Sequence, residues 1–245
     1  MTQPAEGGCF IEVLPLTEAS EHGYANRCLR LPPAPAGSVG CRELLRPARL
    51  RELIDHCYAA YPGCNRQAVV AMWFQIYVDN LLPPAFAASF ALGRAIPVAA
   101  AGTRALFADG WSLGFVVASE GEPAAGDAFA RFRHLLHEHL APLVAALARF
   151  GRASPRLLWS GVAGSIQEVA SAAAHPPIVL PGAVGCADQL LEAPFCPDGL
   201  PNPLHGLTRF GRDDADRRER FRSVCCLRHF LPDFATCPGC PAPLR

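Results

Sequence analysis

The first regular pattern of hydrophobic and polar positions begins after residue 46 and has the period of a helix. From Pro47 onward, apolar side chains return every three or four residues; these are Leu50, Leu53, Ile54 and Cys57. The spacing predicts an amphipathic helix whose first turn holds Pro47, a position that suits proline. The preceding stretch, RLPPAPAGSVG, is rich in proline and glycine, so residues 1–40 are predicted to form an irregular N-terminal segment.

The next stretch, RQAVVAMWFQIYVDNLL, is apolar on most faces of a helix. It predicts a helix in the middle of the fold, with Asn65 as its N-cap. Pro83 and Pro84 are expected to stop this helix, because proline lacks the N–H group of a helical residue. Residues 85–92 are expected to form a short further helix that Gly93 ends.

After Ile96 the pattern indicates strands. Asp109 and Gly110 separate two apolar runs that contain aromatic residues, and this dipeptide favours a tight turn between antiparallel strands. Helical spacing returns over residues 126–150, where Pro142 is expected to introduce a kink.

A further helix is predicted from Ser154, as N-cap, and Pro155, in the first turn. It should end before Pro176, which is followed by a second proline. The stretch RDDADRRERFR, residues 212–222, carries many charges and predicts a solvated helix face or a linker.

The composition supports one folded body. With 245 residues, of which 51% are hydrophobic and 18% charged, the chain is long and apolar enough to bury a core. We therefore predict an α+β fold. Its helix-rich body, with a small antiparallel hairpin or sheet, is expected at residues 41–215, and a cysteine-rich segment is expected at residues 216–245.

The charge and the apolar stretches predict location and partners. The formal net charge is zero and lysine is absent, so no overall positive field indicates a nucleic-acid partner. The chain shows neither the pattern of a signal peptide at its start nor an uninterrupted apolar stretch of membrane-spanning length. We predict a cytoplasmic protein without a membrane span, in which cysteines serve as metal ligands or buried side chains rather than disulfides.

Four of the eleven cysteines lie in the stretch SVCCLRHFLPDFATCPGC, residues 223–240. They are Cys225, Cys226, Cys237 and Cys240. A Cys-x-x-Cys turn lets two thiolates reach one metal atom, and four thiolates suit zinc or an iron–sulfur cluster. Adjacent cysteines tend to point in different directions, which favours two metal atoms over one zinc ion. A zinc site and a thiol–disulfide relay through Cys237 and Cys240 remain alternatives.

The C-terminal pattern Cys-Cys-x10-Cys-x2-Cys resembles that of the FhuF-type ferric-siderophore reductases. The stretches WFQIYVDNLLPP, EHLAPLV, LLWSGVAG and NPL are similar to the body of the same family. The resemblance implies that Cys225, Cys226, Cys237 and Cys240 hold a 2Fe-2S cluster. It also implies an enzyme that reduces siderophore-bound Fe(III), of the hydroxamate type, to Fe(II) by one-electron transfer and so releases iron in the cytosol.

The surroundings of the motif bear on electron transfer. No Gly-x-Gly-x-x-Gly stretch follows a predicted strand, so the electron is expected from a partner such as a ferredoxin or a reductase. Arg222, Arg228 and His229 are expected to place positive charge beside the cluster. His229 replaces the aromatic residue of the family pattern, and Pro238 with Gly239 replaces glycine and a polar residue. Both departures affect the expected reduction potential.

Two functions of another class remain as alternatives. One is a non-enzymatic iron–sulfur redox or iron sensor, and the other is a zinc-stapled siderophore-binding or interaction protein. The body alone also resembles part of the siderophore synthetases, which would suit the binding of a hydroxamate or carboxylate ligand.

Histidines and tryptophans in the body have simpler interpretations. His134 and His137 have the i, i+3 spacing of a metal-binding pair, but together with His139 we interpret them as the polar edge of a helix. Trp111 and Trp159 are candidates for a siderophore pocket, yet their apolar surroundings predict a place in the core.

The other nucleophilic side chains are also interpreted as structural. Ser160 lacks the frame of a hydrolase nucleophile and is predicted to be an ordinary helical residue. The remaining cysteines are predicted to be small hydrophobic side chains or incidental thiols; they are Cys9, Cys28, Cys41, Cys57, Cys64, Cys186 and Cys196.

Overall fold

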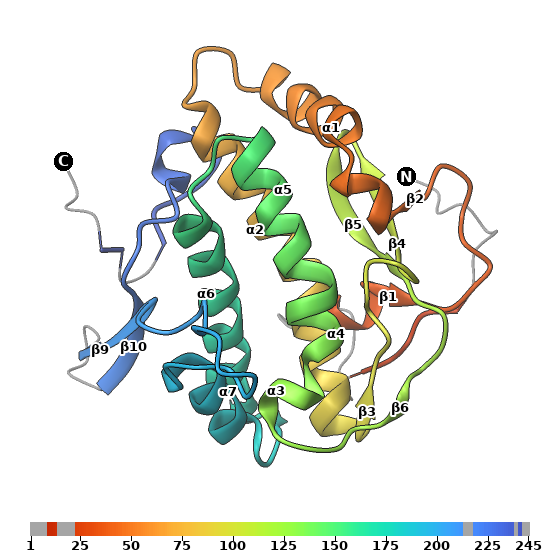
Figure 1. Cartoon of the computed structure of the whole chain (residues 1–245), viewed down its shortest axis with the longest axis vertical. Helices are drawn as coiled ribbons and strands as arrows, with labels where there is room; N and C mark the ends of the chain where they lie inside the picture. The colour runs from red at the N-terminus through yellow and green to blue at the C-terminus, as the bar shows by residue number, and fades with distance from the viewer. Residues whose placement is uncertain (1–8, 14–22, 213–217, 238–239, 242–245) are drawn as a thin grey trace.

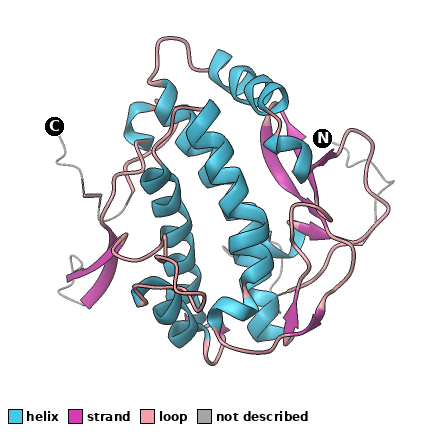
Figure 2. Cartoon of the chain, in the orientation of Figure 1, coloured by secondary structure: helices cyan, strands magenta, loops and turns pink. Residues whose placement is uncertain are grey.

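The structure, a computed structural model, describes residues 9–13, 23–212, 218–237, 240 and 241. Helices α2 (Arg66–Ala91), α5 (Ala141–Phe150) and α6 (Pro155–Ala173) lie side by side at its centre (Figure 1). A four-stranded sheet flanks them on one side, and the hairpin of β9 (Thr208–Arg212) and β10 (Arg218–Arg222) flanks them on the other. Figure 2 shows the same central helices and flanking strands, which confirm the predicted α+β fold.

Helices α1 and α2 begin where the sequence predicts. Helix α1 spans Pro47–Ala59, with Pro47 in its first turn, and buries the four apolar side chains that share one face. In α2, the side-chain oxygen of Asn65 accepts hydrogen bonds from the backbone N–H groups of Gln67 (2.8 Å) and Ala68 (3.4 Å). Asn65 is therefore the N-cap, as expected.

The prediction that Pro83 and Pro84 stop this helix is wrong. Helix α2 continues through both prolines to Ala91, and Gly93, with φ of 64°, follows its C-cap. Leu81, Leu82 and Phe86 are almost fully buried, and each such side chain contributes about 1.5–3 kcal/mol. Together with the burial of the prolines themselves, this offsets the roughly 3 kcal/mol that each proline costs inside a helix.

The main sheet has the strand order β1-β5-β4-β2. Its central hairpin consists of β4 (Arg104–Ala108) and β5 (Trp111–Val116). Asp109 and Gly110 have φ values of 49° and 81° in the connecting turn, which confirms the predicted hairpin. The sheet packs against α2 through β5.

Residues 1–40 are not wholly irregular, contrary to expectation. Strand β1 (Leu29–Arg30) pairs in parallel with β5, and β2 (Val39–Gly40) pairs antiparallel with β4. They satisfy backbone groups that the two-stranded hairpin would otherwise leave unpaired on its outer edges. The short helices η1 (Gly23–Arg27) and η2 (Cys41–Leu45) connect this segment to the sheet and to α1.

The region predicted as one kinked helix over residues 126–150 is instead four successive elements. These are α3 (Ala128–Arg131), α4 (Arg133–Leu135), the π-helical turn η3 (Leu136–Leu140) and α5. The wide π turn places Pro142 in the first turn of α5, where no proline N–H is needed. His139 lies in this turn and is buried, with Nε2 2.6 Å from the Tyr77 hydroxyl, so it is not on a polar helix edge.

Helix α6 begins at Pro155, as predicted, and ends at Ala173, before the prolines. Strands β7 (Ala174–His175) and β8 (Ile178–Val179) form a small pair after it, and α7 (Ala183–Glu192) follows. A second small pair joins β3 (Arg94–Ala95) to β6 (Glu122–Pro123). Within the described part of the chain, none of the helices combines the length and apolarity that a bilayer crossing needs.

The charge run is not a helix face where the structure describes it. Residues Arg218–Arg222 form β10, which pairs antiparallel with β9. Side chains two residues apart share one face of a strand; Arg220 binds Asp188 and Glu192 on α7, and Arg222 binds Gln75 on α2. A strand places Arg220 and Arg222 on the same face, where both side chains bind the helices of the body. Residues 213–217, which include the predicted boundary at residue 215, lie outside the described residues.

Candidate functional site: the C-terminal cysteine pairs

The cysteine segment, residues 223–240, is fixed to the body by apolar side chains. Leu231 is buried, and Val224 and Phe234 pack against the main core. Leu227, with φ of 63°, turns the chain into the short helix η4 (Arg228–Phe230). This helix packs on α2, and Figure 1 shows it beside the first turns of that helix. The packing therefore fixes the cysteine segment against the body, with Cys226 buried and the other three cysteines half-buried.

The structure brings the four predicted cysteines close together, with one direct contact between the two motifs. The Sγ atoms of Cys226 and Cys237 are 3.8 Å apart. Cys240 lies near enough to Cys225 to contribute, after burial, to the raised pKa of Cys225. Among the described residues, no three histidine, cysteine, aspartate or glutamate side chains converge on one metal position. Pro238 and Gly239, between the last two cysteines, lie outside the described residues.

Backbone N–H groups point at both adjacent cysteines. The N–H of Leu227 donates to Cys225 Sγ at 3.4 Å, and the N–H of Arg228 donates to Cys226. The Nδ1 atom of His229 lies 3.7 Å from Cys225 Sγ. Such donors stabilise negative charge on sulfur, so the local backbone is arranged for thiolates.

The acidity of Cys226 separates it from the other buried cysteines of the chain. A hydrogen bond from Cys237, the N–H of Arg228, and the charges of Arg222 and Arg228 lower the pKa of Cys226 to about 5. The same hydrogen bond is the main cause that raises the pKa of Cys237. In contrast, burial raises the pKa values of Cys28, Cys41 and Cys57 to about 12.

Arg222 connects the cysteine segment to the body. Its Nη1 donates to Gln75 Oε1 at 3.0 Å, its Nη2 lies 3.8 Å from Glu168 Oε1, and its side chain is 12% exposed. The guanidinium lies directly over Gly164 of α6, where an added Cβ would be 2.1 Å from Nε. Sequence reasoning placed positive charge here but missed this contact. The second glycine of WSGVAGS, Gly164, could have indicated the contact. Glycine costs stability inside a helix, so its presence there suggests that another group approaches the helix closely.

Asp79 lies next to this arginine in the same network. It accepts a hydrogen bond from Gln75 Nε2 at 2.7 Å and one from the Ser165 hydroxyl. Burial, followed by repulsion from Glu168, raises the pKa of Asp79 to about 7, although its hydrogen bonds and Arg222 act in the opposite direction. The body thus places the ionisable carboxyl of Asp79 close to Arg222, whose charge also acts on Cys226.

Other residues singled out from the sequence are structural. Trp159 is buried, and Trp111 is half-buried and packed against the main core. The Ser160 hydroxyl donates to the Leu157 carbonyl at 2.7 Å inside α6, so it is an ordinary helical residue. His134 Nδ1 binds Glu138 Oε2 at 2.7 Å on an exposed surface.

The seven remaining cysteines include both buried and exposed side chains. Cys28, Cys41, Cys57 and Cys196 are buried, Cys64 and Cys186 are half-buried, and Cys9 is exposed. The buried ones behave as small hydrophobic residues, as predicted.

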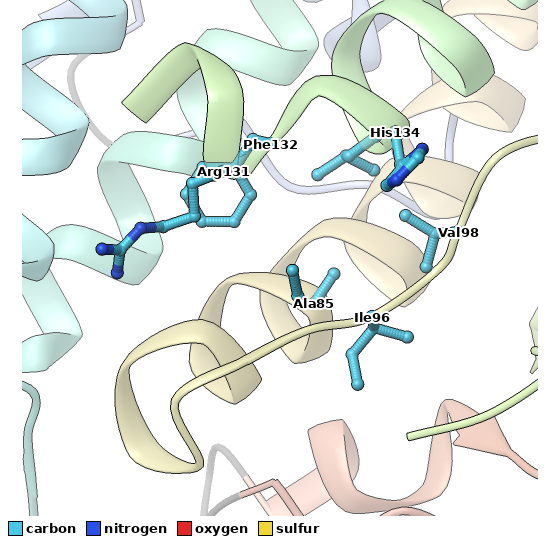
Figure 3. A pocket seen from close by; sticks show the side chains of 8 residues that line it. Ala85, Ile96, Val98, Arg131, Phe132 and His134 are labelled. Carbon is cyan, nitrogen blue, oxygen red and sulfur yellow. The ribbon is translucent and has the colours of Figure 1, made fainter. Parts of the chain in front are cut away.

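A shallow hollow lies at the other end of α2 from the cysteine segment. It has a volume of about 220 Å³, including the solvent at its mouth, and its walls include Ala85, Ile96, Val98 and Phe132. Figure 3 shows the guanidinium of Arg131 pointing away from these apolar side chains, toward Ser89, to which it donates a hydrogen bond. The hollow therefore presents mainly apolar walls, and we assign it no ligand.

Solved structures show that the body shares the fold of siderophore synthetases. The aerobactin synthetase IucA from a hypervirulent pathotype of Klebsiella pneumoniae is similar, with a TM-score of 0.54, 15% identity, and coverage of 69% of this chain and 38% of the synthetase. Its ATP-bound structure gives a TM-score of 0.53 with 16% identity and coverage of 69% and 37%. The chain thus spans well under half the length of these synthetases.

A family match covers most of the body. Residues 71–218, more than half of the chain, match the family described as "Ferric iron reductase FhuF-like transporter". The match includes α2 from residue 71 onward, the hairpin of β4 and β5, and α6, and it ends before the four cysteines. None of the proteins with curated descriptions gives a significant match. The chain therefore belongs to the FhuF-like family of ferric iron reductases.

Proposed function

We propose that this protein is a ferric-siderophore reductase in which Cys225, Cys226, Cys237 and Cys240 hold a 2Fe-2S cluster. The substrate is Fe(III) chelated by a siderophore, of hydroxamate type, and the product is Fe(II). The electron comes from a reduced partner protein such as a ferredoxin or a reductase. The family supports a role with ferric siderophores. The main structural support is the 3.8 Å separation of Cys226 Sγ and Cys237 Sγ, with Cys225 and Cys240 nearby.

The donor set suits an iron–sulfur cluster. Two sulfur ligands of a tetrahedral metal, with bonds of about 2.3 Å, lie about 3.8 Å apart, which is the separation of Cys226 and Cys237. The buried Nε of Arg228 finds no acceptor among the residues that the structure describes. A buried donor without a partner is costly, so an additional sulfur acceptor at this site would satisfy it.

A 2Fe-2S cluster, when bound, supplies single electrons at a potential that its surroundings set. The residues of the chain provide those surroundings. The guanidinium groups of Arg222 and Arg228 act on Cys226, and the N–H group of Leu227 donates to Cys225. Positive charge and N–H donors near the sulfurs favour the more negative, reduced state, and therefore raise the reduction potential. The half-buried cysteines on the outer side leave the site open to a docked chelate.

The first experiment tests the cluster with two matched substitutions of buried cysteines. The purified protein should be reddish-brown, with iron and acid-labile sulfide in equal amounts. Cys226→Ser should lose most of the visible absorbance. Cys57→Ser should retain it, because Cys57 is also buried but lies in α1 with Sγ 3.9 Å from the Asp109 carbonyl oxygen. Equal loss in both variants, or a colourless parent protein with one zinc per chain, would refute the cluster.

The second experiment tests the reaction. The reduced protein is mixed anaerobically with ferrioxamine or ferrichrome in the presence of a ferrous chelator. The spectrum of the reduced protein should disappear as ferrous iron is captured. A stable reduced spectrum with iron that stays ferric would contradict the reductase function and indicate a sensor.

A further inference from the structure

We infer that the four cysteines act as two fixed pairs, Cys226 with Cys237 and Cys225 with Cys240. Each pair takes one cysteine from the Cys-Cys dipeptide and one from the Cys-x-x-Cys turn. Each metal atom of a bound cluster would then be held by both motifs. The metal in this inference rests on the proposed function, whereas the pairing is a property of the protein chain alone.

The inner pair is defined by a direct contact. Cys226 Sγ and Cys237 Sγ are 3.8 Å apart, and Cys226 is 7% exposed. Cys226 is held by the N–H of Arg228 and lies near the guanidinium groups of Arg222 and Arg228. Cys226 is the buried member of the inner pair and Cys237 is half-buried, so the pair is fixed at its Cys226 end, where the charges of Arg222 and Arg228 act.

The outer pair lies toward solvent. Cys225 and Cys240 are both half-buried, and they are the two cysteines that the contact between Cys226 and Cys237 leaves for each other. The Leu227 N–H and the His229 ring contact Cys225, and the rings of exposed His229 and Phe230 lie 4.2 Å apart. A chelate or a protein donor can approach this pair more closely than it can approach Cys226, which is buried.

The pairing differs from the usual expectation for the sequence pattern. A Cys-x-x-Cys turn generally offers both thiolates to the same metal atom. Here Cys226 instead contacts Cys237 from the later turn, and Leu227, directly after the two adjacent cysteines, has a left-handed conformation that turns the chain. The two motifs are therefore tied to each other across residues 227–236.

Disulfide formation in the full-length, metal-free protein tests the pairing without any cluster. Two double variants leave a predicted pair: Cys225→Ser with Cys240→Ser, and Cys226→Ser with Cys237→Ser. Two matched variants leave a crossed pair: Cys225→Ser with Cys237→Ser, and Cys226→Ser with Cys240→Ser. A diazene oxidant such as diamide takes up two electrons and two protons as the two thiols join in a disulfide. Peptide mapping by mass spectrometry follows that bond separately from the seven other cysteines.

Both predicted pairs should oxidise at least about tenfold faster than both crossed pairs, because exchange rates depend on access of one sulfur to the other. Equal rates, or faster crossed pairs, would overturn the inference. Circular dichroism confirms that all four variants retain the fold of the body.

In the iron-loaded protein, electron paramagnetic resonance gives an independent check. Single serine variants at positions 225 and 240 should perturb the reduced spectrum in one way, and those at 226 and 237 in another. A grouping of 225 with 237 would refute the pairing although a cluster is present. A protein that binds no iron would instead refute the proposed function, and the disulfide rates would still decide the pairing.

Discussion

The contact between Arg222 and Gly164 makes a quantitative prediction about stability. Gly164→Ala would place a Cβ atom 2.1 Å from Nε and 2.3 Å from Cζ of Arg222. These distances are far shorter than any nonbonded contact, so the guanidinium must leave its site and its hydrogen bond to Gln75 Oε1. We therefore expect a single added methyl group on α6 to weaken the attachment of the cysteine segment.

The size of the effect is the difference between two terms. A hydrogen bond from a charged donor contributes about 1.5–3 kcal/mol. Alanine is more favourable than glycine inside a helix by roughly 0.5–1 kcal/mol. Gly164→Ala should therefore lower the free energy of unfolding by about 0.5–2.5 kcal/mol, measured as a lower urea midpoint at constant slope by far-UV circular dichroism.

Two controls separate the lost contact from a general effect of alanine. Gly185 lies in α7, and a Cβ added to it would have no heavy atom of another residue within 4 Å, so Gly185→Ala should stabilise the protein by up to about 1 kcal/mol. In an Arg222→Ala background the space over Gly164 is vacant, and Gly164→Ala should then also be stabilising. An equal loss from Gly164→Ala in both backgrounds would refute the role of Arg222, because coupled residues must deviate from additivity.

Two further predictions concern the body. The pKa of Asp79 is raised from 3.8 to about 7 in the folded protein, so the folded protein retains a proton that the unfolded chain loses, and stability should fall between about pH 4 and pH 7. Asp79→Asn should flatten this part of a profile of urea midpoint against pH. An unchanged slope would contradict the assignment. Asn202 is 6% exposed; its side-chain amide donates to the Leu190 and Ala193 carbonyls and accepts from the Leu204 N–H. Asn202→Ala should lower the free energy of unfolding in urea by about 2–4 kcal/mol. A loss below about 0.5 kcal/mol, typical of surface positions, would show that these hydrogen bonds contribute little.

The sequence predicts those elements that local chemistry controls. The Asn65 cap, the Asp109–Gly110 turn and the start of α6 at Pro155 all follow from nearby residues. The passage of α2 through Pro83 and Pro84 does not, because burial against α6 and β5 outweighs the local cost. Tertiary packing, which a single sequence does not display, decides such elements.

The same distinction applies to the candidate site. Spacing selects the four cysteines, and the structure brings them close together. The contact partner of Cys226 is Cys237, 11 residues later in the chain, and the partner of Arg222 is Gln75, which lies 147 residues earlier. Contacts of this range leave little trace in a pattern of residue types. The glycine at position 164 is a partial exception, because its cost inside a helix indicates a close neighbour.

The body and the cysteine segment are structurally coupled beyond the point where the family match ends. The match covers residues 71–218 and therefore excludes Arg222 and the four cysteines. Yet Gly164 and Gln75, both inside the matched body, are arranged around the side chain of Arg222. In a body that served alone, alanine at position 164 would strengthen α6. Arg222, from the C-terminal segment, occupies the helix surface that Gly164 leaves bare, so the glycine is explained by the packing of that segment on the body.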